Sequence, residues 1–318
     1  MKQLKFLFLV LIGVLVSTAF ASCGSDDDEP KMPSEDEIYQ QWLLDAALGT
    51  DGIQDDMAFI IQDGKARIIN VCPLLSGAVT IPSEVYYKGT GKNYPVSFVE
   101  FNLNPGYGWQ DMNWKDKVTS ITIPSSVEDC RIYNACNIKT LSIPSSVTYL
   151  EILKCAELTT ATLSEGLENV GIFECPKITT INFPQSVKEF RLSKLNIKEV
   201  TVPSNLEFME FRECEELEAI HNLENTSLKG LGSRSLFNCK SLKEIKLPKT
   251  TSYIYYGSCE GCTSLSNVHI LRTTPPRLRD SNYGAPFSVM DNLFVPKGCK
   301  EAYKEAYPWS EFKEIIEE

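Results

Sequence analysis

Histidine is the side chain best suited to acid–base and metal chemistry near neutral pH, and this 318-residue chain contains only two. His221 and His269 each follow a cysteine, Cys214 and Cys262, by seven residues. Equal offsets predict that both rings point outward on the same face. If two strand spacings separate them, the rings lie about 10 Å apart, which is too far for one metal ion. We therefore expect both histidines to be surface residues.

Cysteine supplies the second candidate chemistry. Cys259-Glu-Gly-Cys262 has the spacing of redox and zinc motifs, but no second cysteine pair accompanies it. Eleven cysteines in an exported chain favour disulfides, whereas a cysteine that recurs at one repeat position is typical of a small buried apolar residue. The recurring position holds Cys136, Cys155, Cys175, Cys214, Cys239 and Cys262. We expect these thiols to be buried and reduced.

The other polar residues form no nucleophile motif, no glycine-rich phosphate loop and no cluster of metal ligands. Acidic pairs such as Glu215-Glu216 fall in predicted turns, where water solvates them. The sequence therefore predicts no catalytic residue, no metal ion and no cofactor. We expect the chain not to be an enzyme.

The first 22 residues have the order of an export signal, with two lysines, an apolar run from residue 6 to residue 16 and then small residues. The stretch Phe20-Ala21-Ser22-Cys23-Gly24 resembles a bacterial lipobox, in which cleavage leaves a lipidated Cys23, although Phe20 replaces the usual leucine. Cleavage after Ala21 is the alternative, and it would release a soluble protein. We expect a signal peptide over residues 1–22 and a lipidated, flexible tether over residues 23–33.

The tether and the net charge bear on location and partners. The acidic run over residues 24–30 resembles the signal that sends lipoproteins of Bacteroidota-type bacteria to the outer face of the outer membrane, and it is also typical of a solvated tether. Removing Lys2 and Lys5 with the signal lowers the net charge from −11 to −13, which repels nucleic acid. We expect a lipid-anchored, surface-exposed outer-membrane protein that contacts the membrane only through its lipid.

A repeat with a regular period dominates the middle of the chain. Its unit is Cys, one or two residues, an aliphatic, two residues, an aliphatic, one residue, an aliphatic and often Pro. One copy is Cys136-Asn-Ile-Lys-Thr-Leu-Ser-Ile-Pro144. The last aliphatic residue recurs in steps of 20, 20, 20 and 19, and later steps lengthen toward 25. These residues are Ile123, Ile143, Leu163, Phe183 and Val202. We expect the first four to form a buried column in a solenoid.

A second apolar motif follows the proline in each unit. Cys130-Arg-Ile132 is matched by Leu150-Glu-Ile152, Val170-Gly-Ile172, Phe190-Arg-Leu192 and Met209-Glu-Phe211. Alternation with a period of two predicts strands with one side facing inward. Each turn of the solenoid therefore contributes two short strands on different walls, and the proline lies at the corner where pairing ends.

The repeat unit resembles the BspA-type bacterial leucine-rich repeat over roughly residues 79–296. The resemblance extends to the opening turn, Val79-Thr-Ile-Pro82, and to the closing turn, with Pro275-Pro276 and Leu293-Phe-Val-Pro-Lys-Gly298. The chain departs from the family in a shortened corner after the second strand and in Leu195, which replaces the repeated cysteine. The resemblance implies an extracellular binding or adhesion module whose partners differ between members.

The expected fold is mainly β, a right-handed leucine-rich-repeat β-solenoid of about 20–25-residue turns over residues 79–296. Small caps cover its ends at residues 34–78 and 297–318. The first cap begins with Ser34-x-x-Glu37, a capping-box pattern that opens a helix, and continues with a hairpin that turns at Asp63-Gly64. The second cap contains a helix around residues 300–307, followed by apolar residues that fold back.

Candidate contact residues come from three places. Outward hydroxyl residues of the repeat strands predict a flat, weakly charged patch, although threonine is also simply a good exposed-strand residue. A glycine-rich insertion over residues 104–114 carries exposed aromatic rings, or alternatively rings that shield the cap. Tyr256 and its neighbours form another aromatic cluster on the other wall. The candidate residues are Thr122, Thr140, Ser142, Thr160, Thr162, Tyr107, Trp109, Trp114, Tyr253 and Tyr255.

These features favour a non-catalytic cell-surface lipoprotein that acts as an extracellular binding or adhesion module for a protein or a glycan. Two alternatives remain open. The chain could be a structural envelope lipoprotein that acts through assembly with partner proteins, or, more remotely, a polysaccharide-degrading enzyme.

Overall fold

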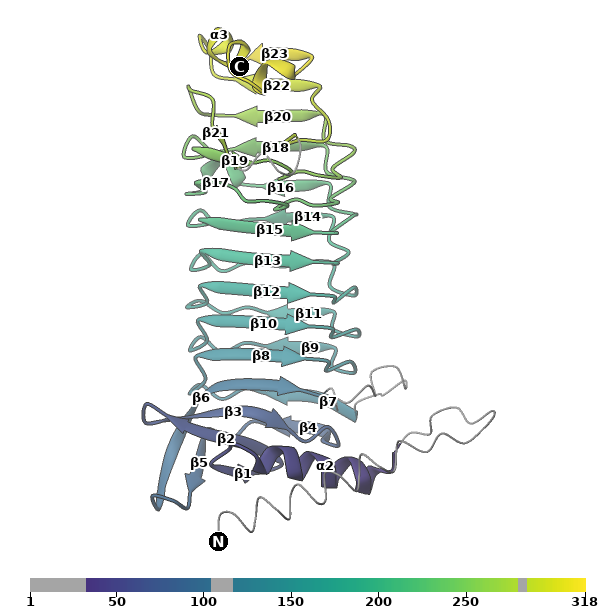
Figure 1. Cartoon of the computed structure of the whole chain (residues 1–318), viewed down its shortest axis with the longest axis vertical. Coiled ribbons are helices and arrows are strands. Elements are labelled where there is room, and N and C mark those ends of the chain that lie inside the picture. Colours follow the sequence, from purple (N-terminus) through teal and green to yellow (C-terminus); the bar gives the residue numbers. More distant parts are fainter. Residues whose placement is uncertain (1–32, 104–116, 280–284) are drawn as a thin grey trace, which may run out of the picture. The chain divides into compact units, whose positions relative to one another are not determined.

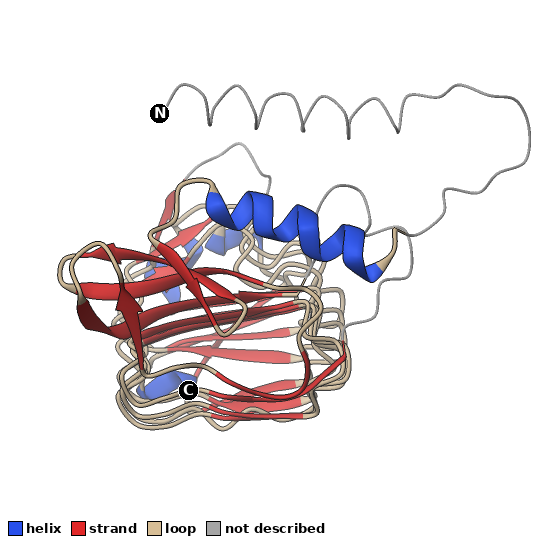
Figure 2. Cartoon of the chain, turned by 90° about the horizontal axis from the view of Figure 1, so that it is seen from below, coloured by secondary structure: helices blue, strands red, loops and turns tan. Residues whose placement is uncertain are grey.

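A computed structural model describes residues 33–103, 117–279 and 285–318 of the chain. Residues 35–318 form one compact unit, which is a mainly β solenoid of about eight turns with leucine-rich repeats. The expected fold class is confirmed, while the hand of the coil stays a prediction. Figure 1 shows the strands stacked one above another, and Figure 2, which looks along the stack, shows strands joined by loop corners.

The first wall of the solenoid is a ten-stranded sheet in the order β1-β2-β3-β6-β8-β10-β12-β13-β15, with β5 paired to β6. From β3 onward the strands in this order run parallel. The strands are β1 (Gly52–Gln54), β2 (Met57–Gln62), β3 (Lys65–Val71), β5 (Glu84–Tyr87), β6 (Lys92–Asn102), β8 (Asp129–Tyr133), β10 (Tyr149–Leu153), β12 (Asn169–Phe173), β13 (Glu189–Ser193) and β15 (Phe208–Arg212).

The second wall consists of shorter parallel sheets, with the pairings β4-β7, β9-β11, β14-β16 and β18-β20-β22-β23. Its strands are β4 (Ser76–Thr80), β7 (Lys117–Thr122), β9 (Thr140–Ser142), β11 (Thr160–Thr162), β14 (Glu199–Thr201), β16 (Ala219–His221), β18 (Glu244–Leu247), β20 (Asn267–Ile270), β22 (Asn292–Val295) and β23 (Glu314–Glu317). A three-stranded parallel sheet of β17 (Gly230–Leu231), β19 (Tyr253–Tyr255) and β21 (Arg277–Arg279) follows β15 along the stack.

Alternate residues of the first-wall strands fill the interior, as the period of two predicts. In β8, β10 and β12 the second and fourth residues are buried and the others are half-exposed. The registers place Ile132, Ile152 and Ile172 side by side, with no exposed surface on any of them. Because each turn contacts only its neighbours, such columns give the stack its continuous core.

The expected column on the second wall is only partly buried. Ile123 and Ile143 are buried, whereas Leu163 and Phe183 are half-buried and pack against the core. Phe190 occupies the interior position that holds Val170 one turn earlier, and its ring stacks on Phe183 with centroids 4.7 Å apart.

Left-handed residues form the corners after the first-wall strands. Asn134, Lys154, Glu174 and Lys194 have φ angles of 53–57°. The N–H of each donates to a carbonyl of the next turn at 2.9–3.0 Å. This conformation is uncommon for residues other than glycine, and here it allows the inter-turn hydrogen bonds to continue through the corner.

The two ends of the stack are covered. Helix α2 (Glu35–Ala47) packs Trp42 and Ala46 against Ala58 and Cys72, and β2 and β3 form the hairpin expected at Asp63-Gly64. At the other end lie α3 (Lys300–Lys304), the 3-10 helix η4 (Trp309–Glu311) and β23. Another 3-10 helix, η2 (Leu223–Asn225), lies within the repeats. None of the helices in the described part of the chain has the length and apolarity that crossing a membrane requires.

Candidate functional site

The repeated cysteine position lies inside the solenoid. Cys155, Cys175, Cys214, Cys239 and Cys262 are buried, as expected for small apolar residues. Cys136 is the exception, because the register of β8 and β10 places Ala135, not Cys136, one turn before Cys155. Ala135 is fully buried and Cys136 is half-buried, so the assignment of Cys136 to the repeated position was wrong by one residue.

The thiols of Cys130 and Cys214 are in an environment that keeps them protonated. The nine buried cysteines in the described residues are free thiols. Burial raises the pKa of the Cys130 thiol to about 12 and that of Cys214 to about 11. Since the thiolate is the nucleophile and the metal ligand, Cys130 and Cys214 behave as packing residues. Within residues 33–103, 117–279 and 285–318, no three His, Cys, Asp or Glu side chains are arranged to hold a metal ion.

Both histidines lie on the second wall, His221 in β16 and His269 in β20. Strand β18 lies between these two strands (Figure 1). His221 is exposed, as expected, and its Nε2 lies 3.2 Å from Glu199 Oε2. His269 was expected at the surface and is instead buried, with only 7% of its surface exposed. Phe294 of β22 stacks on its ring at 4.1 Å, and its Nδ1 lies 2.9 Å from Glu318 Oε1. The His269 ring therefore does point outward from the wall, but the end of the chain covers it.

The predicted hydroxyl residues are exposed and lie side by side on the second wall. We call Thr122, Thr140, Ser142, Thr160 and Thr162 the hydroxyl face. Thr140 pairs with Thr160 and Ser142 with Thr162 across neighbouring strands. The expected exposure of these residues is confirmed, and their role in binding stays a prediction.

The predicted aromatic contacts divide into two groups. Tyr107, Trp109 and Trp114 lie outside the described residues. Tyr253 and Tyr255 are half-buried on β19, with ring centroids 5.9 Å apart and perpendicular planes. They therefore form a real cluster in the sheet that follows β15.

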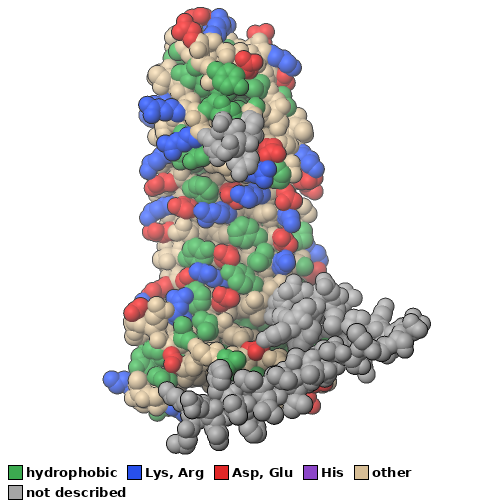
Figure 3. Space-filling view, viewed as in Figure 1, with side chains coloured by type: hydrophobic (Ala, Val, Ile, Leu, Met, Phe, Trp, Pro, Cys, Tyr) green, Lys and Arg blue, Asp and Glu red, His purple; other side chains and the backbone are tan. Residues whose placement is uncertain are grey.

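A larger aromatic cluster, not predicted from the sequence, covers the outward side of the first wall. We call this the aromatic face. Its members are Phe98, Arg131, Tyr133, Tyr149, Glu151, Phe173, Arg191 and Phe208. On this side Figure 3 shows hydrophobic side chains lying between basic and acidic ones.

Arginines stack on the rings of the aromatic face. The guanidinium carbon of Arg67 lies 3.8 Å from the centroid of Phe98, and that of Arg131 lies 5.1 Å from the same ring. Arg131 is also 5.1 Å from the Tyr149 centroid. Phe98 is 4% exposed although it lies outside the interior cluster, because the two arginines cover it. Each contact of this type contributes about 0.5–1 kcal/mol at an exposed site and also fixes the arginine.

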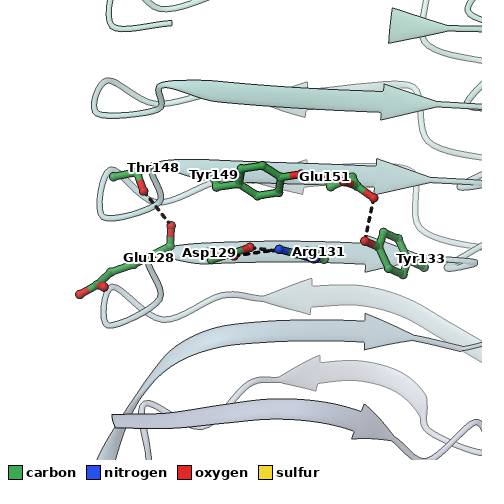
Figure 4. A network of polar contacts seen from close by, with 7 residues as sticks. All are labelled: Glu128, Asp129, Arg131, Tyr133, Thr148, Tyr149 and Glu151. Carbon is green, nitrogen blue, oxygen red and sulfur yellow. Dashed lines mark hydrogen bonds and ion pairs between the residues drawn. The ribbon is translucent and has the colours of Figure 1, made fainter. Parts of the chain in front are cut away.

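Glu151 ties two tyrosines into the same surface (Figure 4). Its Oε1 accepts a hydrogen bond from the Tyr133 hydroxyl at 2.7 Å, and its Oε2 accepts one from Tyr149 at 2.8 Å. Partial burial and these bonds to Glu151 raise the pKa of both tyrosines above their ordinary value. Arg131 in turn pairs with Asp129 at 3.2 Å. The rings and charges are thus held in one arrangement before any ligand arrives.

Such an arrangement can bind a ligand but is not poised for proton transfer. Both oxygens of Glu151 already accept hydroxyl bonds, and Asp129 neutralises Arg131. Fixed aromatic rings offer a large contact area at little entropic cost. The sequence does contain a signal for the aromatic face. In the second apolar motif of each repeat, the residue between the two apolar positions points outward, and in successive turns it is Arg, Glu, Gly, Arg and Glu.

The repeat matches a known protein family. A family model described as "BspA type Leucine rich repeat region" matches six copies over residues 113–194 and 192–277, which is just over half of the chain. No curated protein sequence matches the chain.

Three solved structures are similar over most of the chain. They are a leucine-rich cell surface protein from Faecalibacterium prausnitzii (15% identity, 84% of this chain and 94% of that one, TM-score 0.32), a leucine-rich repeat protein from Bacteroides ovatus (18%, 84% and 100%, TM-score 0.27) and the pneumococcal vaccine antigen PcpA (13%, 85% and 99%, TM-score 0.27).

Proposed function

Because the chain belongs to the BspA-type leucine-rich repeat family, we propose that it is a non-catalytic binding module on a bacterial cell surface, where it holds an extracellular protein or glycan. The observation that carries this proposal is the aromatic face. Arg131, Tyr133, Tyr149 and Glu151 form a connected, preformed cluster on a rigid parallel sheet. Preformed clusters of tyrosine and arginine are typical of binding hot spots.

The hydroxyl face and the aromatic insertion at Tyr107, Trp109 and Trp114 are further proposed contact regions. Extra length in a repeat array maps to loops on one face, often the one that binds. The aromatic face has the stronger support, because its side chains are fixed by one another. Threonines on an exposed strand need no ligand to explain them.

The binding proposal is tested by screening the full chain against immobilised glycans and extracellular-matrix proteins. For the ligand found, Tyr149→Ala is expected to reduce affinity about 30-fold, because a hot-spot ring is worth about 2 kcal/mol. Tyr149→Phe keeps the ring and loses only the bond to Glu151, so most of the affinity should return. Trp109→Ala with Trp114→Ala tests the insertion in the same assay. If Tyr149→Ala binds like the wild type while an insertion or hydroxyl-face variant does not, the aromatic face is the wrong site.

The anchoring proposal concerns Cys23, which we propose carries lipid and holds the protein on the outer surface of the outer membrane. It is supported by the order of charged, apolar and small residues before Cys23 and by the acidic run after it. In Cys23→Ala the lipid attachment site is lost, so the chain is expected to leave the membrane fraction or to remain unprocessed. Metabolic labelling with a fatty acid should mark the wild type alone. A labelled or normally anchored Cys23→Ala protein would refute the proposal.

A further inference from the structure

Two tyrosines and two arginines form a separate patch beyond the aromatic face. We call Tyr253, Tyr255, Arg277 and Arg279 the tyrosine–arginine patch. The register of β19 and β21 pairs Tyr253 with Arg277 and Tyr255 with Arg279. The guanidinium carbon of Arg279 also lies 4.6 Å from the centroid of Tyr253. The four side chains therefore project from one side of two adjacent parallel strands, which Figure 1 places after β15.

The arginines of this patch differ from most other cations on the solenoid. Many surface lysines pair with a glutamate of the preceding turn, as Lys177 does with Glu157 at 2.6 Å and Lys243 with Glu218 at 2.6 Å. Arg277 and Arg279 are both exposed, and neither forms an ion pair with any residue that the structure describes. On a chain of net charge −11, they are two positive charges on one strand with no ion-pair partner among the described residues.

The two tyrosine rings are held in place by the neighbouring strand and by each other. The Tyr253 ring lies against Gly230 of β17, where an added Cβ would collide with the Tyr253 backbone oxygen and ring. The perpendicular contact between Tyr253 and Tyr255 fixes the second ring. Because glycine occupies the β17 position, the Tyr253 ring can settle onto the sheet and present a fixed support for Arg279.

The side chains of the tyrosine–arginine patch favour one class of ligand. Each guanidinium is a planar fork that matches a carboxylate in a bidentate manner. Alternate residues of a strand are about 6–7 Å apart, so the two forks suit consecutive charges along a linear polymer. A protein interface of standard size has an apolar centre. None of the exposed large hydrophobic side chains in the described residues belongs to this patch.

We propose that the tyrosine–arginine patch binds an acidic polysaccharide whose sugars carry carboxylates. The arginines hold successive carboxylate groups, and the tyrosine edges contact the sugar rings between them. This inference rests on the proposed function, that the chain is an extracellular binding module, and it adds the ligand class and two residues, Arg277 and Arg279.

The test uses isothermal titration calorimetry of the full chain with polygalacturonate, a chain of carboxylate-bearing sugars. The wild type should bind, and its affinity should fall as salt is raised. The double variant R277Q/R279Q should lose at least about 10-fold in affinity, because two charge-assisted contacts disappear. R277K/R279K keeps the charge without the fork and should recover only part of the loss. All variants should keep the melting temperature of the wild type, since both arginines are exposed.

Matched controls separate the patch from charge in general. Lys88 and Lys92 are exposed residues of the hairpin formed by β5 and β6, and K88Q/K92Q removes the same two charges. This variant should bind polygalacturonate like the wild type, and an equal loss in both double variants would overturn the proposal. Equal binding of polyglutamate, or binding of dextran sulfate without polygalacturonate, would also overturn it. If the wild type binds no polygalacturonate, the inference fails, whereas the proposed function is decided separately by the ligand screen with Tyr149→Ala.

Discussion

Ile152→Asp is expected to unfold the central turns of the solenoid. Ile152 has no exposed surface and lies between Ile132 and Ile172 of the neighbouring strands. An aspartate there would be stranded without a partner in an apolar column. The cost should be about 4 kcal/mol or more, which is a large share of the stability of an ordinary domain. Urea denaturation followed by circular dichroism measures the change in the free energy of unfolding.

Two matched variants test whether the loss of stability in Ile152→Asp depends on the burial of the substituted residue. Leu163 is half-buried, so Leu163→Asp can turn its carboxylate toward water and should cost clearly less than Ile152→Asp. Thr160 is exposed on β11, and Thr160→Asp should change stability by about 0.5 kcal/mol or less. If the three substitutions cost the same, the interior column is not the core of the fold.

The fold follows from the sequence because its main signal is local and repeated. A step of 20 residues with alternating apolar positions is enough to predict two strands per turn and their parallel stacking. The proline corner is equally local: Val147 N–H donates to Pro144 O at 3.1 Å, and the same bond joins Val187 to Pro184 at 3.2 Å. Such bonds need no information from distant parts of the chain.

The one-residue error at Cys136 arose although the repeat keeps its step of 20 residues there. Cys136 matches the motif by residue type, yet the turn that contains it has one residue fewer between the cysteine and the next aliphatic residue. The inter-strand register decides the position, and it places Ala135 in the interior. A one-residue difference of this kind moves a side chain from the core to the surface.

Features made by distant segments were beyond sequence reasoning. His269 is covered by Phe294 and Glu318, and nothing near His269 in the sequence indicates that the chain end returns there. Likewise Arg131 contacts Phe98 and Tyr149 diagonally, across strands on either side. The alternation of Arg and Glu was visible, but only the register shows which ring each charge meets.

Trp309→Ala is expected to uncouple the last turns of the solenoid from the rest. Trp309 is 1% exposed and packs with its ring centroid 6.1 Å from Phe287, 6.1 Å from Tyr303 and 6.5 Å from Phe312. Its Nε1 donates to the Pro276 carbonyl at 3.3 Å. Removing a buried tryptophan typically costs about 3–5 kcal/mol. The lost contacts all lie at one end of the stack.

The part of the stack that loses stability in Trp309→Ala distinguishes a capping residue from an ordinary core residue. In a solenoid each turn is stabilised by its nearest neighbours, so loss of the cap should expose the turns of β20 and β21 first. Amide hydrogen exchange should therefore rise in β20, β21 and β22 while β8, β10 and β12 keep their protection. Tyr307→Ala removes a ring that is 70% exposed two residues away, and it should leave the exchange pattern unchanged. Equal loss of protection from β8 to β22 in Trp309→Ala would mean that the repeats unfold as one cooperative unit, and that the C-terminal segment stabilises the whole stack rather than its own end.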